Sequence, residues 1–113
     1  MTDRGMGRGA WKVLALAVLM AAIPAHAGDA AAGRQKAIQC QACHGLDGLA
    51  RIPQAPQLAG QNAVYLEKAL KEYRSGARKD EMMSVVAKGL SDQDIRDLAA
   101  YYQSIEIVVK PPR

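Results

Sequence analysis

The chain has 113 residues, half of them hydrophobic, and a formal net charge of +4 at pH 7. This size fits one small domain and leaves no room for a second. After residue 27 there is neither a Lys/Arg run nor a basic stripe interleaved with aromatic residues, so the sequence gives no support for nucleic-acid binding.

The first 27 residues have the pattern of a secretory signal. Basic residues precede an uncharged run from Val13 to Ile23, and Pro24-Ala25-His26-Ala27 supplies the small residues of a cleavage site. As a helix the run would extend roughly 16 Å, about half of a bilayer's hydrocarbon core, which favours a cleaved signal over a membrane anchor. We therefore predict a signal peptide over 1–27, a mature domain over 28–113, and a periplasmic protein without stable membrane insertion after cleavage.

The segment after the predicted signal reads as helices separated by turns. Asp29 is placed to cap an alanine-rich helix that runs toward Cys40. Gly33 lowers the stability of that helix, and its missing side chain would allow another helix to approach closely. From Gly45 to Gly60 the glycines and prolines predict a loop. Since no long period-two alternation is present, the sequence predicts an all-α fold.

Three more helices are expected after the loop. Asn62 caps one that runs to about Ser75, with apolar residues at helical spacing and a glycine in the stop position. A shorter helix follows Asp80 and ends at Gly89. Ser91 starts the last helix, in which Asp94 completes a capping box. The buried stripe of this last helix is predicted to be Ile95, Leu98, Ala99 and Tyr102. Residues 106–113 form an extra C-terminal tail, to which the sequence assigns no role.

The predicted core contains few large side chains. There is no Phe anywhere, and the only Trp, Trp11, lies in the predicted signal. Domains of this size rarely build a sufficient core without a staple. A large apolar cofactor would supply the missing apolar volume.

The segment Cys40-Gln41-Ala42-Cys43-His44 has the spacing of a c-type haem attachment site. Two thiols three residues apart on a turn of helix face the same way, so each can form a thioether with one haem vinyl group. His44 follows directly and is predicted to bind the iron. The cofactor is therefore one covalently bound haem c with its iron.

Two other uses of these cysteines were weighed. A disulfide or a thioredoxin-like redox pair agrees with export, but such a redox pair normally accompanies a strand-to-helix junction, which is not predicted here. A zinc site needs four ligands, and after signal removal only Cys40, Cys43 and His44 remain of the usual Cys/His set.

The motif and the helical pattern together resemble the class I cytochromes c, in particular the short bacterial periplasmic monohaem type that also occurs as single domains of dihaem cytochromes. The resemblance covers nearly the whole mature chain. It is carried, besides the attachment site, by the segments Gly28-Asp29-Ala30-Ala31-Ala32-Gly33, Pro56-Gln57-Leu58-Ala59-Gly60-Gln61, Tyr65-Leu66, Gly76-Ala77-Arg78, Leu90-Ser91-Asp92 and Leu98-Ala99-Ala100-Tyr101-Tyr102.

This resemblance implies a fold of three to five helices packed around one haem. It also implies that the first and last helices cross at Gly33, with Tyr101 or Tyr102 packed against them. Pro56 is similar to the family's proline whose carbonyl accepts a hydrogen bond from the iron-bound histidine. Arg78 lies in a segment that passes near a haem propionate in the family. The alternatives are an ordinary loop proline at Pro56 and a solvated surface arginine at Arg78.

The sixth iron ligand is predicted to be Met83 rather than its neighbour Met82. Consecutive helical residues point about 100° apart, so only one of the two can face the iron. Helical periodicity leans toward Met82. The resemblance selects Met83, because the family's ligand usually lies seven residues before the position that Leu90 occupies here.

A haem iron with two side-chain ligands implies an electron carrier rather than an enzyme, with redox proteins as donor and acceptor. Two other functions stay open: a haem c subunit dedicated to a periplasmic dehydrogenase or oxidase complex, and a five-coordinate haem sensor or peroxidase-like protein. The adjacent methionines disfavour the five-coordinate alternative.

Overall fold

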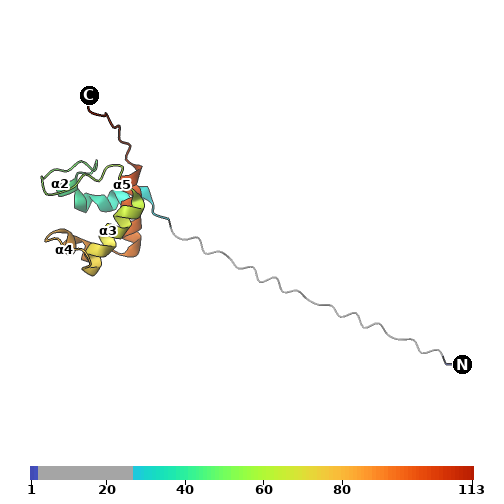
Figure 1. The fold of residues 1–113 in the computed structure, drawn as a ribbon. Helices are drawn as coiled ribbons and strands as arrows, with labels where there is room; N and C mark the ends of the chain where they lie inside the picture. Colours follow the sequence, from blue (N-terminus) through green and yellow to red (C-terminus); the bar gives the residue numbers. More distant parts are fainter. Residues whose placement is uncertain (3–26) are drawn as a thin grey trace.

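A computed structural model of the chain describes residues 1–2 and 27–113, and these residues form helices and no strands. The elements are, in chain order, helix α1 (Ala30–Lys36), the 3-10 turn η1 (Ala37–Cys40), and the helices α2 (Gln41–His44), α3 (Ala63–Ser75), α4 (Met83–Lys88) and α5 (Asp92–Ser104) (Figure 1). The all-α prediction is confirmed. Most of the predicted signal, residues 3–26, lies outside the described residues.

The caps that the sequence predicted define most of the helix ends. The Asp29 carboxylate accepts hydrogen bonds from two backbone N–H groups in the first turn of α1. Asn62 caps α3 through the N–H of Tyr65 at 3.2 Å. Ser91 and Asp94 form a complete capping box at the start of α5, with distances of 3.0 and 2.9 Å. These contacts satisfy backbone donors that a helix start otherwise leaves without partners.

The α1–α5 crossing, where the first and last helices meet, is centred on Gly33. A Cβ atom added at Gly33 would lie 1.9 Å from the carbonyl oxygen of Asp97 and 2.8 Å from the Cβ of Tyr101. No side chain fits there, so glycine permits the backbones to touch. The crossing predicted at Gly33 is therefore present, and Tyr101 is the tyrosine packed directly against it.

A buried carboxylate holds the same crossing together. The Asp97 side chain is 4% exposed. It accepts hydrogen bonds from the Asp29 backbone N–H at 2.8 Å, from Lys36 Nζ at 2.6 Å and from Gln93 Nε2 at 2.7 Å. Lys36 also pairs with Asp94 at 2.9 Å. The sequence did not point to this cluster, because its members become neighbours only when the two helices cross.

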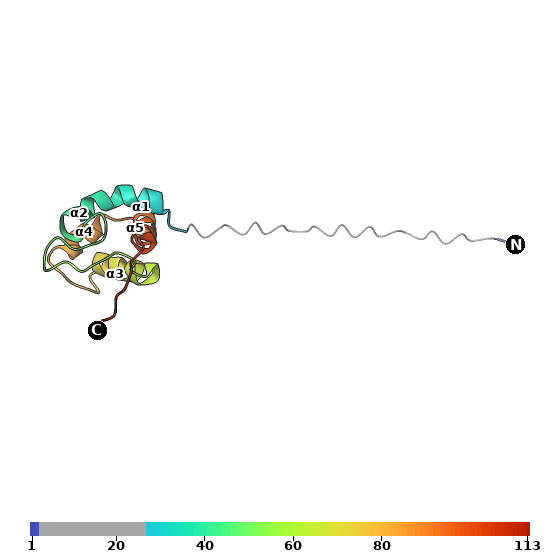
Figure 2. The same cartoon turned by 90° about the horizontal axis from the view of Figure 1, so that it is seen from above.

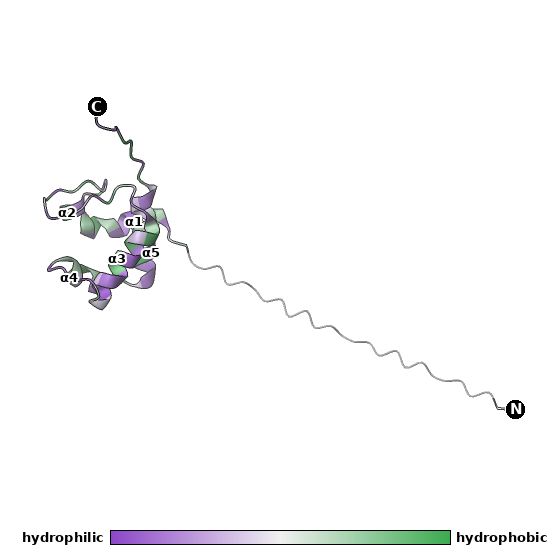
Figure 3. Cartoon of the chain, viewed as in Figure 1, coloured by the Kyte–Doolittle hydropathy of each residue, from purple (hydrophilic) through white to green (hydrophobic). Residues whose placement is uncertain are grey.

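The core lies between α1, α3 and α5, and it is made largely of small side chains (Figure 2). The stripe predicted on α5 is buried as expected. Four of the nine buried hydrophobic residues among those described are alanines, and Ile95 is the largest fully buried side chain. This composition agrees with the expectation of a thin core. Figure 3 shows further apolar segments on α4 and in the tail beyond α5.

Two helix boundaries differ from the simplest expectation. The first helix does not continue unchanged to Cys40, because the 3-10 turn η1 separates α1 from α2. A 3-10 turn shifts the hydrogen-bond register by only one residue, which apolar spacing does not reveal. The short helix α4 starts at Met83, three residues after Asp80. No helix among the described residues is long and apolar enough to cross a bilayer.

Candidate cofactor site

The three residues of the attachment motif lie on two successive short elements. Cys40 ends η1, while Cys43 and His44 belong to α2. Both cysteines are free thiols and partly buried. The His44 ring is buried, with 7% of the residue exposed. Because the chain turns helically through this segment, all three side chains are presented from one short stretch of backbone.

The imidazole of His44 is oriented by the loop that follows it. His44 Nδ1 lies 3.0 Å from the backbone carbonyl oxygen of Pro56, which can only accept a hydrogen bond. Nδ1 therefore carries the proton, and Nε2 keeps a free lone pair that suits a metal ion. Pro56 thus occupies the position that its predicted role requires.

Backbone hydrogen bonds close the loop between His44 and Pro56. The N–H of Arg51 donates to the carbonyl of Cys43 at 2.7 Å, and the N–H of Leu58 donates to the carbonyl of Gly48 at 2.8 Å. Gly48 has a φ of +75°, and an added Cβ there would lie 2.5 Å from the backbone nitrogen of Ala59. This glycine lets the loop fold tightly enough to bring Pro56 back to the histidine.

The two adjacent methionines differ in exposure. Met82 is the residue before α4 and is 64% exposed, whereas Met83 is the first residue of the helix and is partly buried. The Asp80 carboxylate accepts hydrogen bonds from both of their backbone N–H groups at 2.9 Å. Those two bonds lower the pKa of the Asp80 carboxyl. The cap fixes the backbone at the start of α4, and with it the different directions of the two thioethers.

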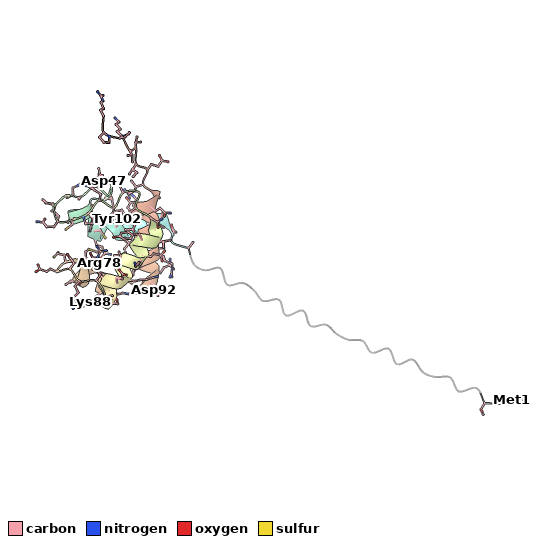
Figure 4. All side chains as sticks on the ribbon, viewed as in Figure 1. Met1, Asp47, Arg78, Lys88, Asp92 and Tyr102 are labelled. Atoms are coloured by element: carbon pink, nitrogen blue, oxygen red, sulfur yellow. The ribbon has the colours of Figure 1, made fainter. Side chains whose placement is uncertain are left out.

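Arg78 is exposed and contacts two aromatic side chains. Its Nη1 donates to the hydroxyl of Tyr65 at 3.3 Å, and its guanidinium lies 4.7 Å from the ring centroid of Tyr73. Such stacking holds the planar guanidinium in place. In Figure 4, Arg78 and the interior residue Tyr102 lie in the helical body.

The elements that carry the histidine and the methionines lie at one end of the molecule. In Figures 1 and 2 the helices α2 and α4 both lie on the left side of the helical body, and in Figure 1 α2 lies above α4. Two candidate ligands, His44 and Met83, are therefore supplied from opposite sides of the same end. Among the described residues, no group of three or more His, Cys, Asp or Glu side chains could hold a metal ion.

The hydroxyl of Tyr102 is a polar group at this site that the sequence did not predict. It is buried and has no hydrogen-bond partner. Cys40 packs against the core cluster that contains Tyr102. The sequence predicted Tyr102 as a core residue, but nothing local says which of the two neighbouring tyrosine hydroxyls will reach a carbonyl.

The comparisons with known proteins agree on one family. The family model "Cytochrome c" matches residues 30–106. Cytochrome c-554(548) of Halomonas halodenitrificans is 54% identical over 83 residues, which cover 71% of this chain and 100% of that protein. The thiosulfate dehydrogenase electron acceptor of Thiomonas intermedia is 39% identical over 102 residues, or 88% of this chain and 46% of that protein.

Solved structures agree with the sequence relatives. The reduced recombinant cytochrome c4 from Pseudomonas stutzeri matches with a TM-score of 0.66 and 43% identity, covering 71% of this chain and 47% of that chain. The chain thus spans less than half the length of this cytochrome c4 and of the thiosulfate dehydrogenase electron acceptor, and it spans the whole of the cytochrome c-554(548).

The described residues fit a covalently attached haem. Two free thiols stand at the attachment spacing, an oriented imidazole keeps one nitrogen free, and a buried hydroxyl beside Cys40 lacks a partner. The small side chains of the core suit a large apolar group packed against them. The chain therefore belongs to the cytochrome c family, as an electron carrier with one covalently bound haem c and not as an enzyme.

Proposed function

We propose that this cytochrome is a periplasmic one-electron carrier in which Cys40 and Cys43 hold the haem and the iron is ligated by His44 and Met83. The observation that carries the proposal is the 3.0 Å contact between His44 Nδ1 and the Pro56 carbonyl oxygen. This contact selects the tautomer with a free Nε2, and it makes the imidazole a stronger base.

Met83 is the preferred second axial ligand because its side chain is partly buried at the start of α4, while Met82 faces solvent. The Asp80 cap holds the backbone of both residues, so exchange between the two thioethers would require the helix start to rearrange. A thioether ligand raises the reduction potential of a c-type haem relative to a second imidazole.

When bound, the haem supplies the one-electron couple between ferrous and ferric iron. The chain's own side chains would then have three tasks: the cysteines would prevent dissociation, His44 would be kept in one orientation as an iron ligand, and Met83 would supply a second ligand. With two ligands supplied by the protein, the iron would have no site left for a substrate. This arrangement supports electron transfer to a docked protein and disfavours the five-coordinate alternative.

Arg78 is proposed to face a haem propionate. Its contacts with Tyr65 and Tyr73 hold a permanently charged, planar group in place at the protein surface, and such a group suits a carboxylate. Replacing Arg78 by Gln should alter the midpoint potential more than replacing its neighbour Lys79 by Gln. Equal shifts in the midpoint potential for the two variants would indicate that Arg78 is an ordinary surface residue.

The periplasmic location rests on the predicted signal over 1–27. Gly28 supports a boundary at this point, since a Cβ added there would lie 2.0 Å from the carbonyl oxygen of Arg96, so the domain begins packing on α5 with its first residue. Mass spectrometry of the protein isolated from periplasm should give an N-terminus at Gly28. Protein that keeps residues 1–27 in a membrane fraction would contradict this.

A second candidate is a dedicated acceptor for one dehydrogenase. The match to the thiosulfate dehydrogenase electron acceptor supports it, because that match extends over more of this chain than the match to cytochrome c-554(548). Under this proposal the purified oxidised protein is reduced by one partner dehydrogenase much faster than by other periplasmic dehydrogenases at equal concentration. Similar rates with all of them would favour a general carrier.

The test of the ligand set uses the two neighbouring methionines as a matched pair. In the oxidised protein a weak far-red absorption band reports sulfur bound to ferric haem iron. Met83→Ala should abolish this band and lower the midpoint potential, whereas Met82→Ala should leave both unchanged. If Met82→Ala abolishes the band, the ligand is Met82; if neither change does, ligation by His44 and a methionine is wrong.

A further inference from the structure

Two adjacent tyrosines near the end of α5 have different hydrogen bonding. The Tyr101 hydroxyl donates to the carbonyl oxygen of Leu46 at 2.6 Å. Tyr102 is only 3% exposed, and its hydroxyl oxygen is buried without a partner that completes a hydrogen bond. The two ring centroids lie 5.2 Å apart and the ring planes are tilted by 57°, so the adjacent rings present their hydroxyls to different surroundings.

An unsatisfied buried hydroxyl is costly. Leaving such a group without a partner lowers the stability of the fold, and a Phe at the same position would avoid that loss while filling nearly the same volume. Because the unpaired Tyr102 hydroxyl lowers the stability of the polypeptide alone, we expect it to gain a hydrogen-bond partner when the haem is attached.

The sulfur of Cys40 is the polar atom placed to become that partner. Cys40 packs against the core cluster that contains Tyr102. Burial raises the pKa of the Cys40 thiol, and the contact with the Tyr102 hydroxyl acts in the opposite direction. Burial likewise raises the pKa of Tyr102 well above its ordinary value, so the phenol keeps its proton at all physiological pH values.

Attachment changes which atom donates in this pair. A free thiol and a phenol can each donate to the other. When the thiol adds across a vinyl group, a carbon–sulfur bond forms and the thiol proton moves to the second vinyl carbon. The resulting thioether has lone pairs and no proton, so Tyr102 is then the only donor of the two.

We infer that Tyr102 is a positioning residue of the attachment site, whose hydroxyl donates a hydrogen bond to the thioether sulfur of Cys40. The inference rests on the proposed attachment at Cys40. The bond satisfies the buried hydroxyl, fixes the rotamer of Cys40 and directs the positive end of the O–H dipole toward the haem periphery. Such a dipole stabilises the more electron-rich ferrous state, and therefore raises the reduction potential.

The test compares Tyr102→Phe with Tyr101→Phe in the purified holoprotein. Each change removes one hydroxyl from the same helix, but the Tyr101 hydroxyl already donates to the Leu46 carbonyl, whereas the Tyr102 hydroxyl is buried without a partner. Tyr102→Phe should lower the midpoint potential, and Tyr101→Phe should leave it close to that of the wild type while reducing thermal stability. Equal shifts in both variants, or no shift in Tyr102→Phe, would overturn the inference.

A second measurement begins with the wild-type protein. In resonance Raman spectra of the wild type, a carbon–sulfur stretching band of a thioether that accepts a hydrogen bond should shift when H₂O is replaced by D₂O. The shift should disappear in Tyr102→Phe and in Cys40→Ala, which keeps the attachment through Cys43. A band insensitive to D₂O in the wild type rejects the hydrogen bond.

Failure of the inference can be separated from failure of the proposed attachment. The pyridine haemochrome spectrum of the wild type counts the thioethers directly, because each saturated vinyl group moves the absorption band. Two thioethers with no D₂O effect would reject only the role of Tyr102. A spectrum with unsaturated vinyl groups would reject attachment at Cys40 itself, and the inference with it.

Discussion

The α1–α5 crossing and the ligand end of the molecule, which comprises His44, the loop to Pro56 and the start of α4, are built in different ways. At the crossing the chain supplies every partner. The Asp97 backbone occupies the space that a side chain at Gly33 would need, and the buried Asp97 carboxylate accepts hydrogen bonds from three donors. At the ligand end the chain supplies donors and orientation, but leaves an imidazole nitrogen and two thiols free. The crossing is complete as polypeptide, and the ligand end is completed by the haem.

This difference has a consequence for the effects of substitutions. A change at the crossing should reduce the free energy of unfolding in the same way whichever iron ligands are present. A change at the ligand end should alter haem retention, spectrum or potential, with smaller effects on the packing of α1 against α5.

The largest effect is expected at His44. Replacing His44 by Ala removes the imidazole that the Pro56 carbonyl holds in place for the iron. The yield of holoprotein should therefore fall to near zero. Cys43→Ala and Cys40→Ala should reduce the yield less severely, because one thioether remains. In the wild type the haem should stay with the polypeptide after acid–acetone extraction; its complete release into the solvent would contradict covalent attachment.

Next in size is the effect of adding one methyl group at the crossing. Gly33→Ala places a Cβ 1.9 Å from the backbone oxygen of Asp97, so the two helices must move apart. Such overpacking should cost about 3 kcal/mol in the free energy of unfolding. Gly89→Ala is the control, because its nearest obstacle is 3.7 Å away and its φ of −82° is ordinary. Chemical denaturation measures both, and equal costs would show that the crossing is loosely packed.

The buried carboxylate should contribute somewhat less. Asp97→Asn keeps the shape but removes the charge that accepts from Lys36 and the Asp29 backbone, at a cost of about 2 kcal/mol. Asp92→Asn is the matched control on the same helix, since Asp92 pairs with Arg74 but its side chain is 62% exposed. That change should cost less than about 1 kcal/mol. A larger loss from Asp92→Asn than from Asp97→Asn would contradict the argument from burial.

The smallest effect is the acid dependence of the same cluster. Hydrogen bonds from Lys36 and from the Ser91 backbone lower the pKa of Asp94 to about 2. Burial raises the pKa of Asp97, but its hydrogen bonds from the Asp29 backbone, Lys36 and Gln93 outweigh that effect and leave the pKa lowered.

Both carboxyls therefore bind fewer protons in the folded state than in the unfolded state, where Asp titrates near pH ~3.9. The stability they contribute is fully present above that pH, and it is lost as the pH falls toward about 2. Denaturation between pH 5 and 2 should show a steeper loss for the wild type than for Lys36→Met. Parallel curves would mean that Lys36 does not lower the two pKa values.

The attachment motif, the helix caps and the buried face of α5 can be predicted from local sequence. The attachment motif depends on the spacing of three residues within one turn, and the caps at Asp29, Asn62 and Ser91 depend on residues within three positions of each other. Interactions over such short separations are dictated by helix geometry alone, and the sequence therefore predicted them. The same holds for the buried stripe of α5, because one helical period sets it.

Other features depend on residues far apart in the chain. The sequence did not predict that Asp97 is buried, because an acidic residue in a helix is ordinarily solvated. Its hydrogen-bond donors Asp29 and Lys36 also lie 68 and 61 residues away in the chain. The sequence placed Tyr102 on the buried stripe but did not show which tyrosine hydroxyl would find a partner. Only the packing of α5 gave Tyr101 a carbonyl partner while it left the Tyr102 hydroxyl buried without one.

The sequence by itself thus determined the attachment motif, the capping residues at the starts of α1, α3 and α5, and the buried face of α5. Only the tertiary structure decided which polar groups are satisfied by the chain and which are left for the haem site. The physical reason is that a hydrogen bond or a close backbone contact needs atoms within about 3 Å, and for residues distant in sequence that proximity exists only after the helices have packed.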